Sequence, residues 1–266
     1  TQGREVRDLL VVHPVESMWT LCGISRTESE RPKAYDRSII AVRDSLLSGG
    51  VDFDYGDEEI MSRLAKIETG ADGPAIIINQ ARYKAILVPP TITLRKTTLE
   101  LLEAFKAAGG KVAFAGEIAA KLDAEPSDAI QQFADQCEKL PASGPEIPAA
   151  FNSVANRFAA VTESGETIPS LVHMLREDDD AYYLFICNTG LTREQMAADE
   201  NPNYVDQRIA TYPDARLTVR CAPEGEVLEL DPDTGAIYAA DAERLVDGWE
   251  VHTFFPTLGS RLFVIN

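Results

Sequence analysis

The stretch YKAILVPPTITLRKTTLELLEAFKAAGGKVAFAG, Tyr83 to Gly116, determines the predicted fold. It begins with a short aliphatic run that two prolines end, and it continues as an amphipathic segment that closes on Gly109 and Gly110. A second aliphatic run follows. Because proline cannot continue a strand ladder and glycine is common just after the last helical turn, this order predicts a strand, a helix and a strand. Two strands joined by a helix run parallel in one sheet.

The sequence upstream repeats this order. DLLVVHP at 8–14 predicts a strand buried on both faces, and YDRSIIAVRDSLLSGG at 35–50 predicts a helix that ends at two glycines. VDFDYG at 51–56 predicts a second strand, and the acidic residues 57–59 favour the start of the next helix. We therefore predict an α/β domain, a parallel sheet with helices on both faces in three layers.

Two smaller elements complete this half of the chain. The segment 70–84 predicts an extra strand or hairpin arm before the strand at Ala85–Pro89. Downstream, apolar residues at helical spacing follow Ser127 as far as Cys137 and predict one more helix.

The second half has a different pattern. The segment PASGPEIPAAFNS, 141–153, is rich in proline, alanine, serine and glycine, and it predicts a linker. Short β-branched or aromatic runs follow it: SLVHMLRE, AYYLFICNT, RLTVRCA, VLELDPDTGAIYAA, WEVHTFFP and SRLFVIN. They predict an antiparallel β-sandwich, with a turn at Gly235 and a polar excursion at 192–204. The predicted division is an α/β domain at 1–140, a linker at 141–160 and a β domain at 161–266.

Composition limits the function. The net charge of -18 disfavours nucleic acid as a partner, and no apolar stretch is long enough to span a bilayer. No glycine-rich phosphate loop follows the first strand, no nucleophile elbow is present, and no residues have metal-ligand spacing. We therefore predict no cofactor and no metal, and we interpret His173 and His252 as structural or surface residues. The compartment stays open, with the cytoplasm favoured.

The candidate site lies at the carboxyl ends of the first two strands, where parallel sheets bind ligands. His13, Glu16 and Trp19 follow the first strand, and Asp54 and Tyr55 end the second. Carboxylates that bind hydroxyl groups and aromatic rings that stack on a sugar would make this set a carbohydrate site.

Each of these residues also has a structural interpretation. His13 could bond a backbone carbonyl, and Trp19 could fill space under a neighbouring domain. Asp57, at the same edge, could cap a helix. A hydrolase that uses His13 as base with Asp54 or Glu16 as its orienting acid is a further alternative, although no nucleophile or metal accompanies it.

Several motifs together resemble one family. LLVVHPVESMW, GGVDFDYGDEEIM and the stretch from Tyr83 to Gly116 resemble the flavodoxin-type, glutamine-amidotransferase-like domain of large bacterial glycoside hydrolases, called the beta-galactosidase trimerisation domain. YYLFICNTG, VLELDPDTGAIYAA and FFPTLGSRLFVIN resemble the β-rich segment that follows it in those proteins. The resemblance covers roughly Asp8–Gly116 and Ser170–Asn266.

The resemblance implies an accessory, non-catalytic region of a glycoside hydrolase. Its implied partners are the catalytic barrel of the parent chain, near whose active-site mouth it would pack, and a second copy of the chain. Phe114 and Ala115 stand where an amidotransferase would carry its cysteine nucleophile. The alternative is a stand-alone carbohydrate-binding module that uses the His13–Trp19 loop.

Overall fold

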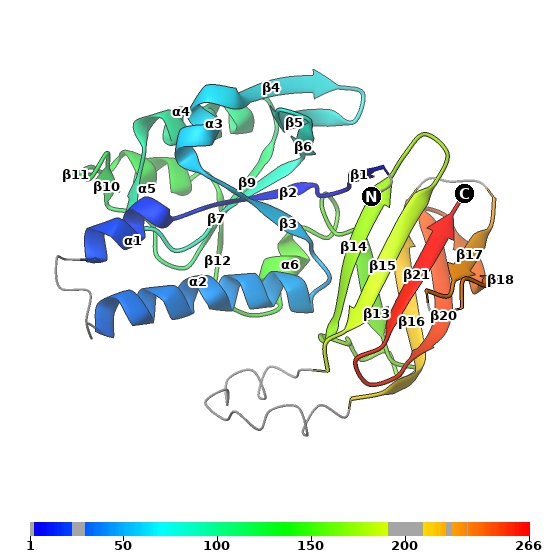
Figure 1. Ribbon diagram of the computed structural model, residues 1–266. Coiled ribbons are helices and arrows are strands. Elements are labelled where there is room, and N and C mark those ends of the chain that lie inside the picture. Colours follow the sequence, from blue (N-terminus) through cyan, green and yellow to red (C-terminus); the bar gives the residue numbers. More distant parts are fainter. Residues whose placement is uncertain (1–2, 23–29, 191–209, 222–224, 233) are drawn as a thin grey trace. The chain divides into compact units, whose positions relative to one another are not determined.

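The computed structural model describes residues 3–22, 30–190, 210–221, 225–232 and 234–266 (Figure 1). The chain forms two compact units. The α/β unit consists of Arg7–Leu46 and Phe53–Ala155, and the β-rich unit consists of Thr1–Val6, Leu47–Asp52 and Asn156–Asn266. The chain therefore enters the β-rich unit three times. The predicted polar excursion at 192–204 lies outside the described residues.

A five-stranded parallel sheet forms the centre of the α/β unit. Its order is β12-β9-β7-β2-β3, with every neighbouring pair parallel. The strands are β2 (Leu9–Val12), β3 (Phe53–Gly56), β7 (Ala85–Val88), β9 (Lys111–Ala115) and β12 (Glu138–Leu140). All residues of β2 and β7 are buried, as their continuous aliphatic runs predict.

Helices cover both faces of this sheet (Figure 1). They are α1 (Val15–Leu21), α2 (Glu30–Ser48), α3 (Glu58–Leu64), α4 (Lys96–Ala107), α5 (Ala129–Ala134) and α6 (Glu146–Ala150). Buried residues of α3, α4 and α5 share one core with alternate residues of the strands, and the fully buried Phe105 of α4 is among them. The prediction of an α/β fold is confirmed in this form.

Three short segments differ from the prediction. The His13–Trp19 stretch is not a loop, because a helix begins at Val15, directly after Pro14. The helix expected as far as Cys137 ends at Ala134, and the edge strand β12 follows. The expected arm at 70–84 is a small antiparallel sheet of β4 (Ala65–Gly70), β5 (Gly73–Ile78) and β6 (Ala81–Tyr83). A second small sheet consists of β8 (Thr93–Leu94), β10 (Lys121–Leu122) and β11 (Glu125–Pro126).

The β-rich unit consists of two antiparallel sheets around one core, as predicted. The six-stranded sheet has the order β1 (Arg4–Glu5), β14 (Leu171–Glu177), β15 (Tyr182–Asn188), β21 (Ser260–Ile265), β17 (Val227–Leu230) and β18 (Ile237–Ala239). The four-stranded sheet has the order β13 (Phe158–Val161), β16 (Tyr212–Arg220), β20 (Gly248–Phe255) and β19 (Asp241–Leu245). Each of the six predicted runs contains a strand, whereas β1, β13 and β19 were not predicted.

The range 141–160 contains regular structure. It holds α6 and most of β13, and the side chains of Ile147 and Phe151 are fully buried. The compact α/β unit extends to Ala155. The domain boundaries at 140 and 161 stay predictions.

Gly50 and Gly235 are among the glycines with a positive φ, a backbone conformation that other residues rarely adopt. Gly235 has φ +72°, and it lies between β17 and β18, where the sequence predicted a turn. Gly50, just after α2, has φ +74°, and a Cβ atom there would lie 2.3 Å from the carbonyl oxygen of Phe158.

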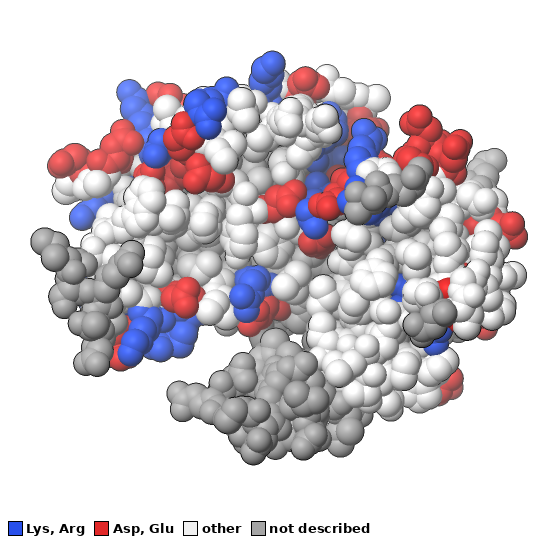
Figure 2. Space-filling view, viewed as in Figure 1, with Lys and Arg blue, Asp and Glu red and all other residues white. Residues whose placement is uncertain are grey.

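Charged side chains of both signs are mixed on one face of the molecule. On the face shown in Figure 2, Lys and Arg side chains lie among Asp and Glu side chains and form no large basic patch. No helix of the described residues is long and apolar enough to cross a membrane.

Candidate functional site

The α/β unit contains a cavity of about 330 Å³ at the carboxyl ends of β2 and β3. His13 and Tyr55 line it together, and their ring centroids lie 5.2 Å apart. The His13 amide donates a hydrogen bond to the Gly56 carbonyl, which fixes the chain just after β2. The other lining residues come from α1 and α2 and the turn before α1: Pro14, Val15, Met18, Tyr35, Asp36, Ile39, Ile40 and Arg43.

This cavity suits a small polar ligand. Its volume lies at the lower end of the range for small-molecule sites, which starts at about 300 Å³. The Asp36 carboxylate is a hydrogen-bond acceptor, and Arg43, whose Nε donates to Asp44 Oδ1 at 2.9 Å, has further N–H donors. Ile39 and Ile40 supply apolar surface. The Tyr55 phenol is neutral near pH 7 and able to donate, and partial burial raises its pKa further above the ordinary value of 10.0.

The other predicted site residues are held elsewhere. Among the described residues that line the cavity, Glu16, Trp19 and Asp54 are absent. Asp54 accepts hydrogen bonds from Arg7 Nη1 at 2.9 Å and from the Tyr83 hydroxyl at 2.8 Å. Trp19 of α1 is 64% exposed. The structure therefore brings together only His13 and Tyr55 of the predicted set.

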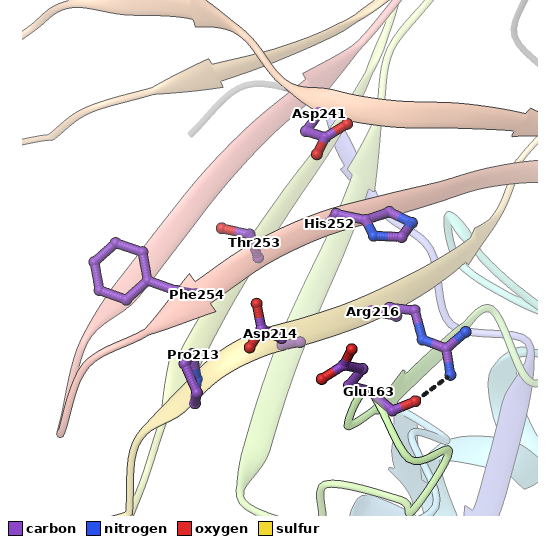
Figure 3. A pocket seen from close by; sticks show the side chains of 9 residues that line it. Glu163, Pro213, Asp214, Arg216, Asp241, His252, Thr253 and Phe254 are labelled. Carbon is purple, nitrogen blue, oxygen red and sulfur yellow. Dashed lines mark hydrogen bonds between the residues drawn. The ribbon is translucent and has the colours of Figure 1, made fainter.

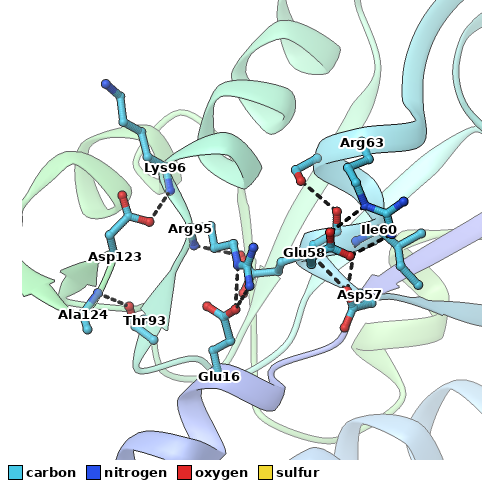
Figure 4. Close-up of polar contacts among 12 residues, drawn as sticks. Glu16, Asp57, Glu58, Ile60, Arg63, Thr93, Arg95, Lys96, Asp123 and Ala124 are labelled. Carbon is cyan, nitrogen blue, oxygen red and sulfur yellow. Dashed lines mark hydrogen bonds and ion pairs between the residues drawn. The ribbon is translucent and has the colours of Figure 1, made fainter.

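Glu16 forms an ion pair with Arg95 (Figure 4). Arg95 Nε donates to Glu16 Oε1 at 2.6 Å, which links α1 to the start of α4. The two side chains are 33% and 20% exposed, so water still screens the pair and its net stabilisation is small, about 0–1 kcal/mol. Glu16 is thus part of a structural contact beside the strand ends.

Ser17 fills the position where ligands bind in many open parallel sheets. The strand order reverses between β2 and β7, and ligands of such sheets bind in the crevice at that reversal. Here the fully buried Ser17 hydroxyl donates to the Thr93 carbonyl and accepts from the amides of Ile92 and Thr93. Protein atoms of α1 occupy this crevice, and the cavity of His13 and Tyr55 lies to the side, under α2.

Glu58 is a buried carboxyl group that the sequence did not mark. It is 1% exposed, and its Oε2 accepts from the Arg95 amide at 2.8 Å (Figure 4). No residue of the described chain bonds its Oε1. Burial raises the pKa of Glu58, and the backbone bond from Arg95 opposes that shift. Asp57 beside it caps α3 by accepting from the amides of Glu59 and Ile60, which confirms the structural interpretation of Asp57.

We expect the substitution Glu58→Gln to change how stability depends on pH. At a pH below its ordinary pKa of 4.5, Glu58 is protonated in both the folded and the unfolded chain. Above it the unfolded chain ionises first, so the free energy of unfolding falls as pH rises toward the raised pKa. Glu58→Gln removes that loss. In urea unfolding at pH 4, 5.5 and 7, the free energy of unfolding of the variant should therefore increase relative to that of the natural chain as pH rises.

The neighbouring substitution Glu59→Gln is the matched control. Glu59 is exposed, and its hydrogen bond with Arg63 lowers its pKa, so its contribution is lost as pH falls. The free energy of unfolding of Glu59→Gln should therefore decrease relative to that of the natural chain as pH rises. The same trend in both variants would contradict the assignment for Glu58.

No metal cluster is found in the part of the chain that the structure describes, where no group of three or more His, Cys, Asp or Glu side chains could hold an ion. His173 stacks on Phe158 with ring centroids 4.3 Å apart, which confirms its structural interpretation. His252 lies in a second hollow, in the β-rich unit.

Comparison with known proteins gives similarity in fold. No protein-family model and no curated protein matches the sequence. Among solved structures, the rhamnosidase from Novosphingobium sp. PP1Y matches over 99% of this chain and 23% of its own, with a TM-score of 0.60 and 14% identity. The beta-galactosidase from Bacillus circulans sp. alkalophilus matches over 100% of this chain and 42% of its own, with a TM-score of 0.57 and 11% identity.

A third structure is similar to the same extent. The GH42 beta-galactosidase Gan42B from G. stearothermophilus matches over 98% of this chain and 40% of its own, with a TM-score of 0.56 and 10% identity. The chain thus spans between about a quarter and two fifths of the length of these proteins. At these identities the similarity establishes a shared fold that covers both units.

Proposed function

We propose that the chain is an accessory, non-catalytic region of a larger carbohydrate-active glycoside hydrolase. The observation that carries the proposal is the extent of the shared fold: nearly the whole chain matches part of a rhamnosidase and of two beta-galactosidases. A segment that resembles both the α/β unit and the β-rich unit thus occurs within much longer proteins. The catalytic barrel of the parent protein is the proposed partner, and a second copy of the chain is a further one.

The α/β unit is proposed to be of the flavodoxin and amidotransferase-like type. Its strand order β3-β2-β7-β9-β12 supports this, because the first strand lies second and the later strands follow on its other side. β9 ends at Ala115 and Gly116 follows, so no cysteine is available there for amidotransferase chemistry. The unit is thus proposed to keep the fold without the reaction.

Trp19 is the proposed anchor for the barrel. Trp19 is 64% exposed on a short helix, and tryptophan is enriched among the residues that dominate protein interfaces. The pair of Glu16 and Arg95 holds α1 and therefore the position of this side chain. In the parent enzyme Trp19 would pack against the barrel or line the mouth of its active site.

The proposal predicts the size and activity of the natural protein. The natural protein, identified by peptides that contain VVHPVESMWT, should be longer than this chain by at least about 250 residues, the typical length of a barrel. The full protein should hydrolyse an aryl glycoside, and the 266-residue chain alone should not. Intact-mass spectrometry and a chromogenic assay measure the two quantities.

A natural protein of 29.1 kDa, or hydrolysis by the short chain after repurification, would contradict the proposal. The first result would favour the stand-alone binding module. The cavity of His13 and Tyr55 supports that second function, because it places two aromatic rings beside hydrogen-bonding groups. Such a module would use this cavity rather than the carboxylates of Glu16 and Asp54, which are bound to arginines.

A further inference from the structure

The four-stranded sheet of the β-rich unit carries a hollow that lies apart from the site described above. Leu217 of β16 and Val251 of β20 point into the core, so Arg216 and His252 beside them in sequence point to the outer face. There they line a groove of about 590 Å³ (Figure 3). The full lining is Glu163, Pro213, Asp214, Ala215, Arg216, Asp241, His252, Thr253 and Phe254.

Polar groups cross the floor of this groove in one row. Arg216 lies opposite His252 in the sheet, and His252 lies opposite Asp241, so three strands each contribute one side chain. Arg216 Nη2 donates to the Glu163 carbonyl at 3.2 Å (Figure 3). It also donates to the Thr162 carbonyl at 3.4 Å, and the two bonds hold the guanidinium in place. Among the described residues, Arg216 Nε has no hydrogen-bond partner although it is buried.

A β-bulge shapes one end of the groove. Tyr212 lies opposite Phe255 and Ala215 opposite Thr253, so two residues of β16, Pro213 and Asp214, stand against one residue of β20. Bulges of this kind redirect side chains and are frequent beside binding sites. This one places the Asp214 carboxylate over the groove (Figure 3).

An aromatic ring borders the same end. Phe254 is 52% exposed, and the guanidinium of Arg261 lies 4.5 Å from its ring centroid. Arg261 Nε also donates to the Phe254 carbonyl at 3.1 Å. The Arg261 guanidinium thus covers one face of the Phe254 ring and holds the side chain in position, so the other face can stack on a ligand.

We propose that this groove binds a neutral saccharide. The carboxylates of Glu163, Asp214 and Asp241 accept hydrogen bonds from sugar hydroxyls, Arg216 donates to ring or hydroxyl oxygens, and Phe254 stacks on the apolar face of a sugar ring. Three carboxylates against one arginine repel sugars that carry carboxylate or sulfate. The ligand class rests in part on the proposed function, while the site itself is independent of the cavity in the α/β unit.

Calorimetric titration of the 266-residue chain with neutral oligosaccharides of galactose, glucose and xylose tests the proposal. We expect binding, and we expect Phe254→Ala and Asp241→Asn each to weaken it at least tenfold, which corresponds to about 1.4 kcal/mol. Tyr238→Ala is the control for the first variant, because Tyr238 is 54% exposed on β18 and lies outside the groove. Glu243→Gln, on β19 two residues from Asp241, is the control for the second.

Far-UV circular dichroism and urea unfolding of each variant separate a lost contact from a lost fold. No binding to any neutral sugar at millimolar concentration would overturn the proposal, as would binding that the two groove variants leave unchanged. Stronger binding of sugars that contain uronic acid would also overturn it. The two proposals can fail separately. If the parent protein has a barrel and glycosidase activity but the titration detects no sugar binding in the groove, this inference is refuted and the proposed function stays intact.

Discussion

Replacement of Phe105 by alanine is expected to lower the free energy of unfolding of the α/β unit by about 3–5 kcal/mol. The Phe105 side chain is fully buried between α4 and the parallel sheet, in the core that contains Ile86 and Val112. Its ring also packs under Gly110, where an added Cβ would lie 2.4 Å from a ring atom. Removing the ring leaves a cavity that the rigid strands cannot close.

Urea unfolding measures this loss, and hydrogen exchange followed by mass spectrometry locates it. Glu103→Ala is the control, since Glu103 is an exposed residue of the same helix and should change stability little. Amides of β9 should lose protection in Phe105→Ala, whereas amides of β15 should keep it if the two units are separate domains. An equal loss in both units would contradict the predicted division of the chain.

The substitution Gly50→Ala is expected to destabilise the β-rich unit by about 3 kcal/mol. One part of the cost is the left-handed backbone at φ +74°, which an alanine Cβ opposes. The rest is overlap with the Phe158 carbonyl, because the Cβ atom would lie 2.3 Å from its oxygen. The segment of Gly50 would have to move away from β13.

Gly235→Ala separates the two contributions. Gly235 has nearly the same φ of +72°, yet nothing lies within 4 Å of the position that its Cβ would occupy. Gly235→Ala should lower the free energy of unfolding by only about 1–2 kcal/mol. Thermal or urea unfolding of both variants measures the difference, and equal losses would show that the close approach to Phe158 contributes nothing.

Much of the fold could be predicted because its strands are strongly patterned. The parallel strands β2, β7 and β9 are continuous aliphatic runs, and such runs are typical of strands buried on both faces. β12 carries Glu138 and Lys139 in three residues and lies at the sheet edge, so no apolar run marks it. α1 spans only seven residues after a proline, too few to show a helical period.

The candidate site could be predicted only in part, and the reason is geometric. β2 and β3 are neighbours, which brings His13 close to Tyr55. Successive strand residues point to opposite faces, however, so Asp54 and Tyr55 could not both line one cavity. Arg43 and Ser17 reach the strand ends through the packing of α2 and α1, and no local pattern of sequence records that packing.

The three entries of the chain into the β-rich unit set an order of events during protein synthesis. β1 pairs with β14, and Arg4 bonds Glu177 across 173 positions of the chain. A ribosome that adds about 5–20 residues per second needs roughly 10–35 s to make that partner. The α/β unit is complete on the ribosome before β14 is made, so it can fold while the first residues wait. A recombinant fragment that starts at Asn156 would lack β1, leave β14 as an open sheet edge and tend to aggregate.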